Sequence, residues 1–349
     1  MTHRIASLDL LRGAAAFAVA IPHYAMTAPG DHALAETVSI LGVEIFFVLS
    51  GYVLAPQILL VAGAPNKLAN FRIFLVRRWM RTVPPYLIAL VIVAITTHQL
   101  VTADFVRYAL YVQNFAHQAN TQDFFAIAWS LSVEEWFYLT FPPVLLLFAA
   151  TARGRPPPAL LAALTFIAVI SALRFLFADW SHWGEQVRRI VIFRMDAIAW
   201  GFALHLATSR ITVTTPVKPA MALAAASGIA VGLTLRLAET SEVWIEVAFH
   251  LYASALGAAA IVLAGALRKQ IEIRPWLTQI SFFLGRISYS TYLFHLIVLS
   301  ALSRMDVAYG PAGFGLYLTV TCLVTWLMAE GLERPILSSR PKYRLPVEG

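Results

Sequence analysis

Long apolar runs alternate with short polar connectors along almost the whole chain. A helix needs about 20 mostly apolar residues to cross the hydrocarbon core of a bilayer. The pattern therefore predicts an all-α, polytopic integral membrane protein with about ten transmembrane helices. The predicted spans are 6–27, 37–60, 79–99, 128–150, 159–178, 188–208, 218–236, 244–267, 281–302 and 313–332.

The composition supports this assignment. Hydrophobic residues make up 59% of the 349 residues and charged residues only 13%, whereas a soluble domain carries about 25% charged residues. The chain has too little polar surface to coat a globule of this size, so lipid must solvate its exterior. A single cysteine, Cys322, excludes an intrachain disulfide framework.

The basic residues follow the connectors in a regular way. With the N-terminus inside, most Lys and Arg fall in the inner connectors and in the C-terminal tail, as the positive-inside rule requires. This pattern predicts that both termini are cytoplasmic and that the protein lies in the inner (plasma) membrane. The net charge of +7 is then a topology signal and does not indicate nucleic-acid binding. The basic residues predicted outside are Arg107, Arg236, Arg304 and the borderline pair Arg188 and Arg189.

The same pattern predicts a simple domain organisation. Residues 1–335 form one transmembrane domain, and residues 336–349 form a short basic cytoplasmic tail. The long outer connector at 100–127 is aromatic and amphipathic, so we expect it to lie on the membrane surface or to fold over an outer opening.

The first predicted span carries two ionisable residues, Arg12 and His23. Eleven residues are close to three helical turns, so both side chains lie on one face, roughly 16 Å apart along the axis. An ionisable residue within a span costs about 2.5–3.5 kcal/mol and usually faces the bundle interior. The functional interpretation is a binding group and a base on one face. The alternative is that Arg12 extends to the interface and His23 packs in the core.

The second predicted span carries Glu44 in an otherwise apolar run. In a hairpin of the first two spans, His23 and Glu44 lie at similar depths, and we therefore predict that they pair. A carboxylate can fix the tautomer of an imidazole and stabilise its protonated form, which prepares a general base. The alternative is a buried pair that only holds two helices together.

Two arginines, Arg78 and Arg81, lie three residues apart in the sequence RRWMRTVPPY, on one helical face at the cytoplasmic entry of the third span. Guanidinium groups bind phosphate oxygens through bidentate, charge-assisted hydrogen bonds. An anionic ligand is therefore plausible at this position. Topology alone also explains arginines at a cytoplasmic helix end.

Further polar residues lie in later spans. The fourth span begins AWSLSVEEWFY, and its aromatic and hydrogen-bonding side chains would suit a sugar-like acceptor. In the sixth span, Arg194 and Asp196 are close enough in sequence to neutralise each other locally, and in the ninth His295 is as consistent with a structural role as with binding. The sequence contains no phosphate-binding glycine loop, dinucleotide fingerprint, HExxH or paired CxxC, so we expect no metal site.

Taken together, seven segments resemble the acyltransferase-3 family of integral membrane acyltransferases. They are LDLLRG with a histidine eleven residues after its arginine, GVEIFFVLSGY, RRWMR followed by PPY, WSLSVEEWFY, FRMDAIAWG, ISYSTYLFH and LERP. The second segment commonly has aspartate where this chain has Glu44. Since the chain ends soon after its last predicted span, it resembles the stand-alone type without a C-terminal hydrolase-like domain.

The resemblance implies transfer of an acyl group, often acetyl, from cytoplasmic acyl-CoA to a hydroxyl of a carbohydrate such as an exopolysaccharide or a lipid-linked glycan. It also implies that His23 is essential and that Arg78 and Arg81 handle the donor. Acyl-CoA is then a cosubstrate, and no cofactor is permanently bound. On this hypothesis Arg12 joins the other two arginines at the CoA phosphates. His23, oriented by Glu44, takes the proton of the acceptor hydroxyl. The candidate substrate-binding residues are Trp129, Ser130, Ser132, Glu134, Arg194 and Asp196.

Two alternatives stay open at this point. An acyl group could pass through a covalent intermediate on Ser130 or Ser132. The buried Arg, Glu and His residues would also suit a proton-coupled exporter of glycans or small molecules. The expected partners are acyl-CoA, a carbohydrate or glycolipid acceptor, membrane lipid and glycan-assembly proteins.

Overall fold

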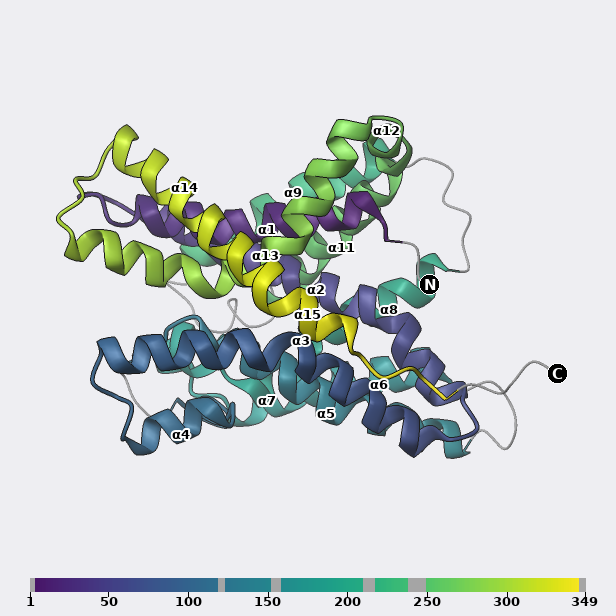
Figure 1. Cartoon of the computed structure of the whole chain (residues 1–349). Coiled ribbons are helices and arrows are strands. Elements are labelled where there is room, and N and C mark those ends of the chain that lie inside the picture. Colours follow the sequence, from purple (N-terminus) through teal and green to yellow (C-terminus); the bar gives the residue numbers. More distant parts are fainter. Residues whose placement is uncertain (1–3, 119–122, 152–157, 210–216, 238–248, 345–349) are drawn as a thin grey trace.

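The computed structural model describes residues 4–118, 123–151, 158–209, 217–237 and 249–344, and most of these residues are helical, with no strand among them (Figure 1). Each of the ten predicted spans coincides with a helix or with two consecutive helices, although residues 244–248 of the eighth lie outside the described residues. Among the described residues, seven helical stretches are long and apolar enough to cross a membrane. The predicted all-α, polytopic membrane fold is confirmed.

The elements, in chain order, are α1 (Ala6–Ala25), α2 (Ala33–Gly63), α3 (Lys67–Thr96), α4 (Ala103–Ala109), α5 (Ala128–Thr151), α6 (Ala159–Phe177), the short turns η1 (Trp180–His182) and η2 (Trp183–Val187), α7 (Val191–Arg194), α8 (Asp196–Thr208), α9 (Val217–Leu237), α11 (His250–Ala266), α12 (Arg268–Glu272), α13 (Pro275–Arg304), α14 (Pro311–Met328), η4 (Ala329–Glu333) and α15 (Arg334–Ser338).

The helices form two halves that α2 and α8 join. In Figure 1 the upper half contains α1, α9, α11, α13 and α14, and the lower half contains α3 to α7. Helix α2 packs against α1 and α11 on one side and against α3 and α5 on the other, while α8 packs against both α6 and α11. Polar residues on α2 and α8 therefore lie between the two halves.

Two glycines allow α2 and α8 to approach closely. A Cβ atom on Gly51 would lie 1.8 Å from the carbonyl oxygen of Ile198, and one on Gly201 would lie 1.8 Å from that of Val48. Small residues are the usual means by which membrane helices bring their backbones together. Because of this close crossing, two side chains seven residues before these glycines meet in the interior: Glu44 on α2 and Arg194, the last residue of α7.

The third helix begins at Lys67, earlier than the predicted residue 79. The extension is amphipathic, with Phe74 and Leu75 buried, so the arginines at 72–81 lie on a helix and not in a connector. The predicted sixth span is interrupted as its charges suggested, because α7 ends at Arg194 and α8 begins at Asp196.

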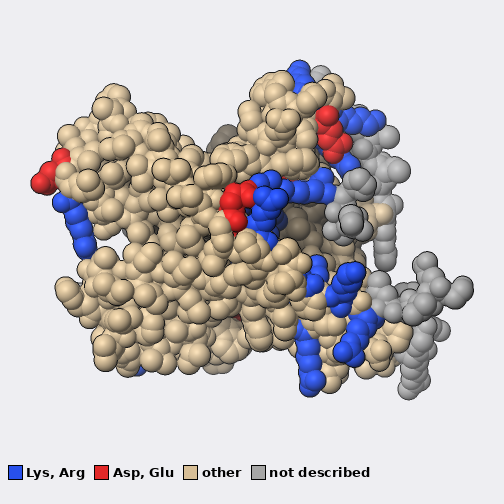
Figure 2. Space-filling model, viewed as in Figure 1, with Lys and Arg blue, Asp and Glu red and all other residues tan. Residues whose placement is uncertain are grey.

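Charge is distributed unevenly over the surface. On the face shown in Figure 2, most Lys and Arg side chains gather at the end of the molecule where Figure 1 places both chain ends. This asymmetry has the direction that the positive-inside pattern requires. The assignment of that end to the cytoplasm stays a prediction.

Candidate active site

A pocket with about 720 Å³ of empty space opens between α1, α2, α3, α5 and α13. Three separate helices, α1, α3 and α5, bring five of the predicted site residues to its wall. These residues are Arg12, Arg78, Arg81, Ser130 and Glu134.

The arginines of the pocket are not neutralised by carboxylates. Among the described residues no ion pair involves Arg78 or Arg81, and Arg78 donates only to the Gln57 amide oxygen, at 3.3 Å. Arg12 lies 3.7 Å from an Asp9 oxygen, but the other oxygen of Asp9 already pairs with Arg4 at 2.5 Å. The wall thus carries unpaired guanidinium groups, which suit phosphate oxygens.

The acidic residue of the pocket wall, Glu134, is held by hydroxyl groups. Ser50 donates to one of its oxygens at 2.7 Å, and Tyr138 donates to the other at 2.9 Å. Both donors also line the pocket. Because hydroxyl donors satisfy it, Glu134 does not neutralise the arginines by direct pairing.

On another side, the wall is formed by a pair of hydroxyl groups. The Ser130 Oγ atom lies 2.6 Å from the Tyr292 hydroxyl oxygen, and Tyr292 also donates to the carbonyl oxygen of Ile127 at 3.2 Å. The Tyr292 ring is 6.1 Å from the ring of His295, measured between centroids. The pocket wall is therefore continuous with a pair of histidines behind it.

His23 and His295 form this pair, with ring centroids 5.0 Å apart. The Nδ1 atom of His23 lies 2.7 Å from the Val19 carbonyl oxygen, and that of His295 lies 2.8 Å from the Tyr292 carbonyl oxygen. A carbonyl can only accept, so both Nδ1 atoms carry a hydrogen, and Nε2 of each neutral ring is left as the basic nitrogen. His295 is fully buried and its Nε2 atom has no hydrogen-bond partner within the described part of the chain, whereas His23 is half-buried.

The predicted pairing of His23 with Glu44 is wrong. Glu44 is fully buried, and its two oxygens lie 2.5 and 2.6 Å from Nη2 of Arg194. The hairpin placed the two residues at similar depths, but depth does not fix the direction in which a side chain points around its helix. Glu44 faces Arg194 at the end of α7, and the backbone carbonyl of Val19 orients His23 instead.

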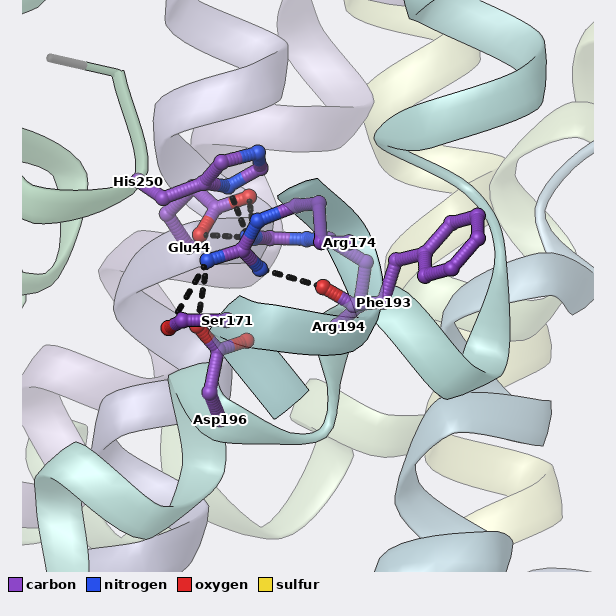
Figure 3. A network of polar contacts seen from close by, with 7 residues as sticks. All are labelled: Glu44, Ser171, Arg174, Phe193, Arg194, Asp196 and His250. Atoms are coloured by element: carbon purple, nitrogen blue, oxygen red, sulfur yellow. Dashed lines mark hydrogen bonds and ion pairs between the residues drawn. The ribbon is translucent and has the colours of Figure 1, made fainter. Parts of the chain in front are cut away.

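Arg194 and Glu44 belong to a buried network of charges (Figure 3). Arg194 also contacts Nδ1 of His250, and Arg174 pairs with Asp196 at 2.9 Å. The predicted local neutralisation of Arg194 by Asp196 is therefore wrong. Side chains two positions apart do not face each other on a helix, and the chain is also interrupted between α7 and α8.

Two other predicted substrate-binding residues lie off the pocket. Trp129 packs beneath the guanidinium of Arg188, which is 5.0 Å from its ring. Ser132 is fully buried and accepts a hydrogen bond from Gln113 at 2.7 Å. Of the two candidate serines, Ser130 is the one that lines the pocket.

Reasoning from the sequence did not identify three residues of the pocket wall on α13: Ser288, Tyr289 and Tyr292. The signal was present in ISYSTYLFH, where Ser288, Tyr292 and His295 follow the spacing i, i+4, i+7 of one helical face. A polar stripe on an otherwise apolar span would have indicated that this face is turned towards a polar interior.

Comparison with known proteins agrees with the motifs. The acyltransferase-domain model of the acyltransferase-3 family matches residues 5–330. The peptidoglycan O-acetyltransferase OatA of Listeria monocytogenes is 31% identical over 186 residues, which are 48% of this chain and 28% of that protein. The O-acetyltransferase OatA of Staphylococcus aureus strain NCTC 8325 is 27% identical over 317 residues, covering 83% of this chain and 50% of that protein. The chain spans half or less of the length of these relatives. No solved structure matches it.

Proposed function

Because this chain belongs to the acyltransferase-3 family, we propose that it is an acyl-CoA-dependent O-acyltransferase that moves an acetyl group to a hydroxyl of a carbohydrate. The observation that carries the proposal is the pocket in which the unpaired arginines Arg78 and Arg81 lie with Arg12, Ser130 and Tyr292. Phosphate-binding groups and hydroxyl groups on one wall match a donor with phosphates at one end and a thioester at the other.

The donor would enter from the end of the molecule where the basic residues gather (Figure 2). Arg12, Arg78 and Arg81 would bind its phosphates from two helices, α1 and α3. The pantetheine arm is then free to extend along the pocket towards Tyr292, behind which the histidine pair lies. In this placement, residues from five helices orient one flexible molecule, which is how enzymes lower the entropic part of a barrier.

His23 is the proposed general base. Its Nδ1–H is held by the Val19 carbonyl, so Nε2 accepts the proton of the acceptor hydroxyl while the oxygen attacks the thioester carbonyl carbon. The carbon–sulfur bond breaks as the tetrahedral intermediate collapses, and the leaving thiolate takes up this proton from the His23 imidazolium. His23 is half-buried and lies beyond the pocket wall, where an acceptor could approach from the side opposite to the donor.

A covalent route would use Ser130, since Ser132 is buried away from the pocket. Incubation with acetyl-CoA alone, followed by mass spectrometry of the intact protein and its peptides, distinguishes the two routes. Direct transfer predicts no acetyl adduct. An acetyl adduct on Ser130 would instead support a two-step mechanism through a covalent intermediate.

The acceptor is proposed as a carbohydrate on the basis of the relatives' names. The Listeria relative is named for peptidoglycan and the Staphylococcus relative for O-acetylation without a stated acceptor. A sugar hydroxyl is a weak acid, so its attack on a thioester needs a positioned base such as the one proposed at His23.

Thiol release from acetyl-CoA tests the function directly, with peptidoglycan and a lipid-linked glycan extract as acceptors and the purified protein in liposomes. His23→Gln should lower acceptor-dependent release by about 10²–10⁴-fold. His117→Gln, which changes an exposed histidine of the outer connector, should not. Near-normal turnover in folded His23→Gln would contradict the assigned base. Glycan transport by the wild type without acetyl-CoA consumption would support an exporter.

A further inference from the structure

Residues 339–344 follow α15 and fold back across the cytoplasmic half of α3, where Figure 1 shows them as the yellow chain after α15. We call these residues the C-terminal strap. The sequence predicted this region only as a basic tail. In the structure it is part of the packed molecule.

Hydrogen bonds at both ends hold the strap to α3. The fully buried amide of Asn70 donates to the Arg344 carbonyl at 3.0 Å and accepts from the Arg344 N–H at 2.7 Å. Arg77 donates to the Pro341 carbonyl at 2.7 Å, and its guanidinium lies 5.1 Å from the ring of Tyr343. These contacts fix the strap beside the arginines of α3.

Arg340 is the residue that this arrangement leaves without partners. Its Nε and Nη2 atoms are buried and make no hydrogen bond, and no ion pair among the described residues includes it. Burial and the neighbouring guanidinium groups of Arg78 and Arg81 lower the pKa of Arg340 to about 9. An anion bound among these three groups would remove this unfavourable electrostatic energy and satisfy the free N–H donors.

The position of Arg340 indicates which anion it meets. Arg12, Arg78 and Arg81 line the pocket, whereas Arg340 lies outside the lining. CoA carries a diphosphate between its pantetheine arm and its nucleoside, and a separate 3′-phosphate on the ribose at the far end from the thiol. A donor with its thioester towards Tyr292 and its diphosphate at the pocket arginines would place the 3′-phosphate at the entrance.

We propose that Arg340 of the C-terminal strap binds the ribose 3′-phosphate of the donor, so that the strap forms one wall of the CoA entrance and makes the protein prefer CoA over dephospho-CoA. This inference rests on the proposed function. A lipid phosphate has the same chemistry, and the experiment must separate the two sources.

The test compares the affinities of CoA and dephospho-CoA for the protein in phosphatidylcholine nanodiscs, by isothermal titration calorimetry. Arg340→Gln should weaken CoA about 10- to 100-fold, the scale of a charge-assisted hydrogen bond, and should leave dephospho-CoA unchanged. Arg340→Lys should retain part of the preference. The matched control is Lys342→Gln, which removes the same charge from an exposed position of the same strap and should bind both ligands as the wild type does.

Three results would overturn the inference. One is an equal loss for both ligands in Arg340→Gln, which would mean that Arg340 acts on a shared part of the molecule or on the fold. Another is a CoA affinity of Arg340→Gln that equals that of the wild type. The third is weaker CoA binding by the wild type in phosphatidylglycerol nanodiscs than in phosphatidylcholine nanodiscs, with no such difference in Arg340→Gln, which would assign the site to a lipid phosphate. Failure of the wild type to bind either ligand, in a protein with a normal melting transition, would instead overturn the proposed function.

Discussion

Two groups of arginines in this protein, one buried and one half-buried, have opposite surroundings. Between the halves, Arg194 pairs with Glu44 and Arg174 pairs with Asp196, in each case within 2.9 Å. In the pocket, Arg78 and Arg81 have no carboxylate partner among the described residues. The first pair of arginines is satisfied by the protein itself, and the second pair is available to an anion from outside.

The difference separates a structural role from a binding role. Removing one member of a buried ion pair leaves the other as an uncompensated buried charge, so the cost falls on stability. Removing an unpaired arginine from a pocket relieves charge repulsion in the ligand-free protein, so the variant loses affinity for the anionic ligand and not stability. Variants in the two groups should therefore differ in what they lose.

Arg194→Leu should have the largest effect, a loss of about 3–5 kcal/mol of stability, because Glu44 stays buried without its partner. Thermal unfolding in detergent measures it. The double variant Glu44→Gln/Arg194→Leu should recover much of the loss, since it buries no charge. The control is Arg268→Gln, which breaks an exposed pair on α12 and should cost less than about 1 kcal/mol. An equal loss in the single and double variants would contradict the structural role.

Arg78→Gln and Arg81→Gln should each weaken acetyl-CoA binding by about 1.5–3 kcal/mol, the range for a hydrogen bond to a charged group. Their melting temperatures should stay at or above that of the wild type. Arg286→Gln is the matched control, because Arg286 lies on α13 and pairs with Glu330. The comparison fails if the pocket variants unfold early while their donor affinity is retained.

His295→Gln should lower the rate of acetyl transfer about tenfold, or ~1.4 kcal/mol, without changing the affinity for acetyl-CoA. The Nε2 atom of His295 has no partner in the resting protein, and its ring lies 5.0 Å from that of His23. A nearby acceptor nitrogen stabilises the imidazolium that forms on His23 during the reaction. A changed donor affinity with an unchanged rate would place His295 in the donor site instead.

Asn70→Ala should have the smallest effect, about 1 kcal/mol on donor affinity, because it removes two neutral hydrogen bonds that hold the strap. Hydrogen exchange at residues 339–344 should quicken in the same variant. If exchange quickens while CoA affinity is unchanged, the strap does not contribute to the donor site.

The sequence allowed the spans and five residues of the pocket wall to be predicted. Runs of about 20 apolar residues identify membrane helices almost independently of their neighbours. Arg78 and Arg81 share a helical face with spacing that is visible in the sequence, and the positive-inside pattern predicts that Arg12 lies at the same end of the membrane. Local spacing and topology were sufficient for these residues.

The partners of Glu44 and Arg194 could not be predicted in the same way. They lie 150 residues apart, and their contact depends on how α2 and α8 rotate about the close crossing at Gly51 and Gly201. The position of a residue in a predicted span gives its depth in the membrane. It does not give the direction in which the side chain points around the helix axis. For the same reason, the sequence paired His23 with the wrong residue and did not place Arg340 beside the pocket.

The most direct test of the account compares the affinity of the wild-type protein for CoA and for pantetheine, which lacks every phosphate. If the unpaired arginines of the pocket bind the donor, CoA should bind saturably and pantetheine at least about 100-fold more weakly, since several charge-assisted contacts are lost. Arg78→Gln/Arg81→Gln should reduce that difference. Equal binding of CoA and pantetheine by the wild-type protein would contradict the central claim.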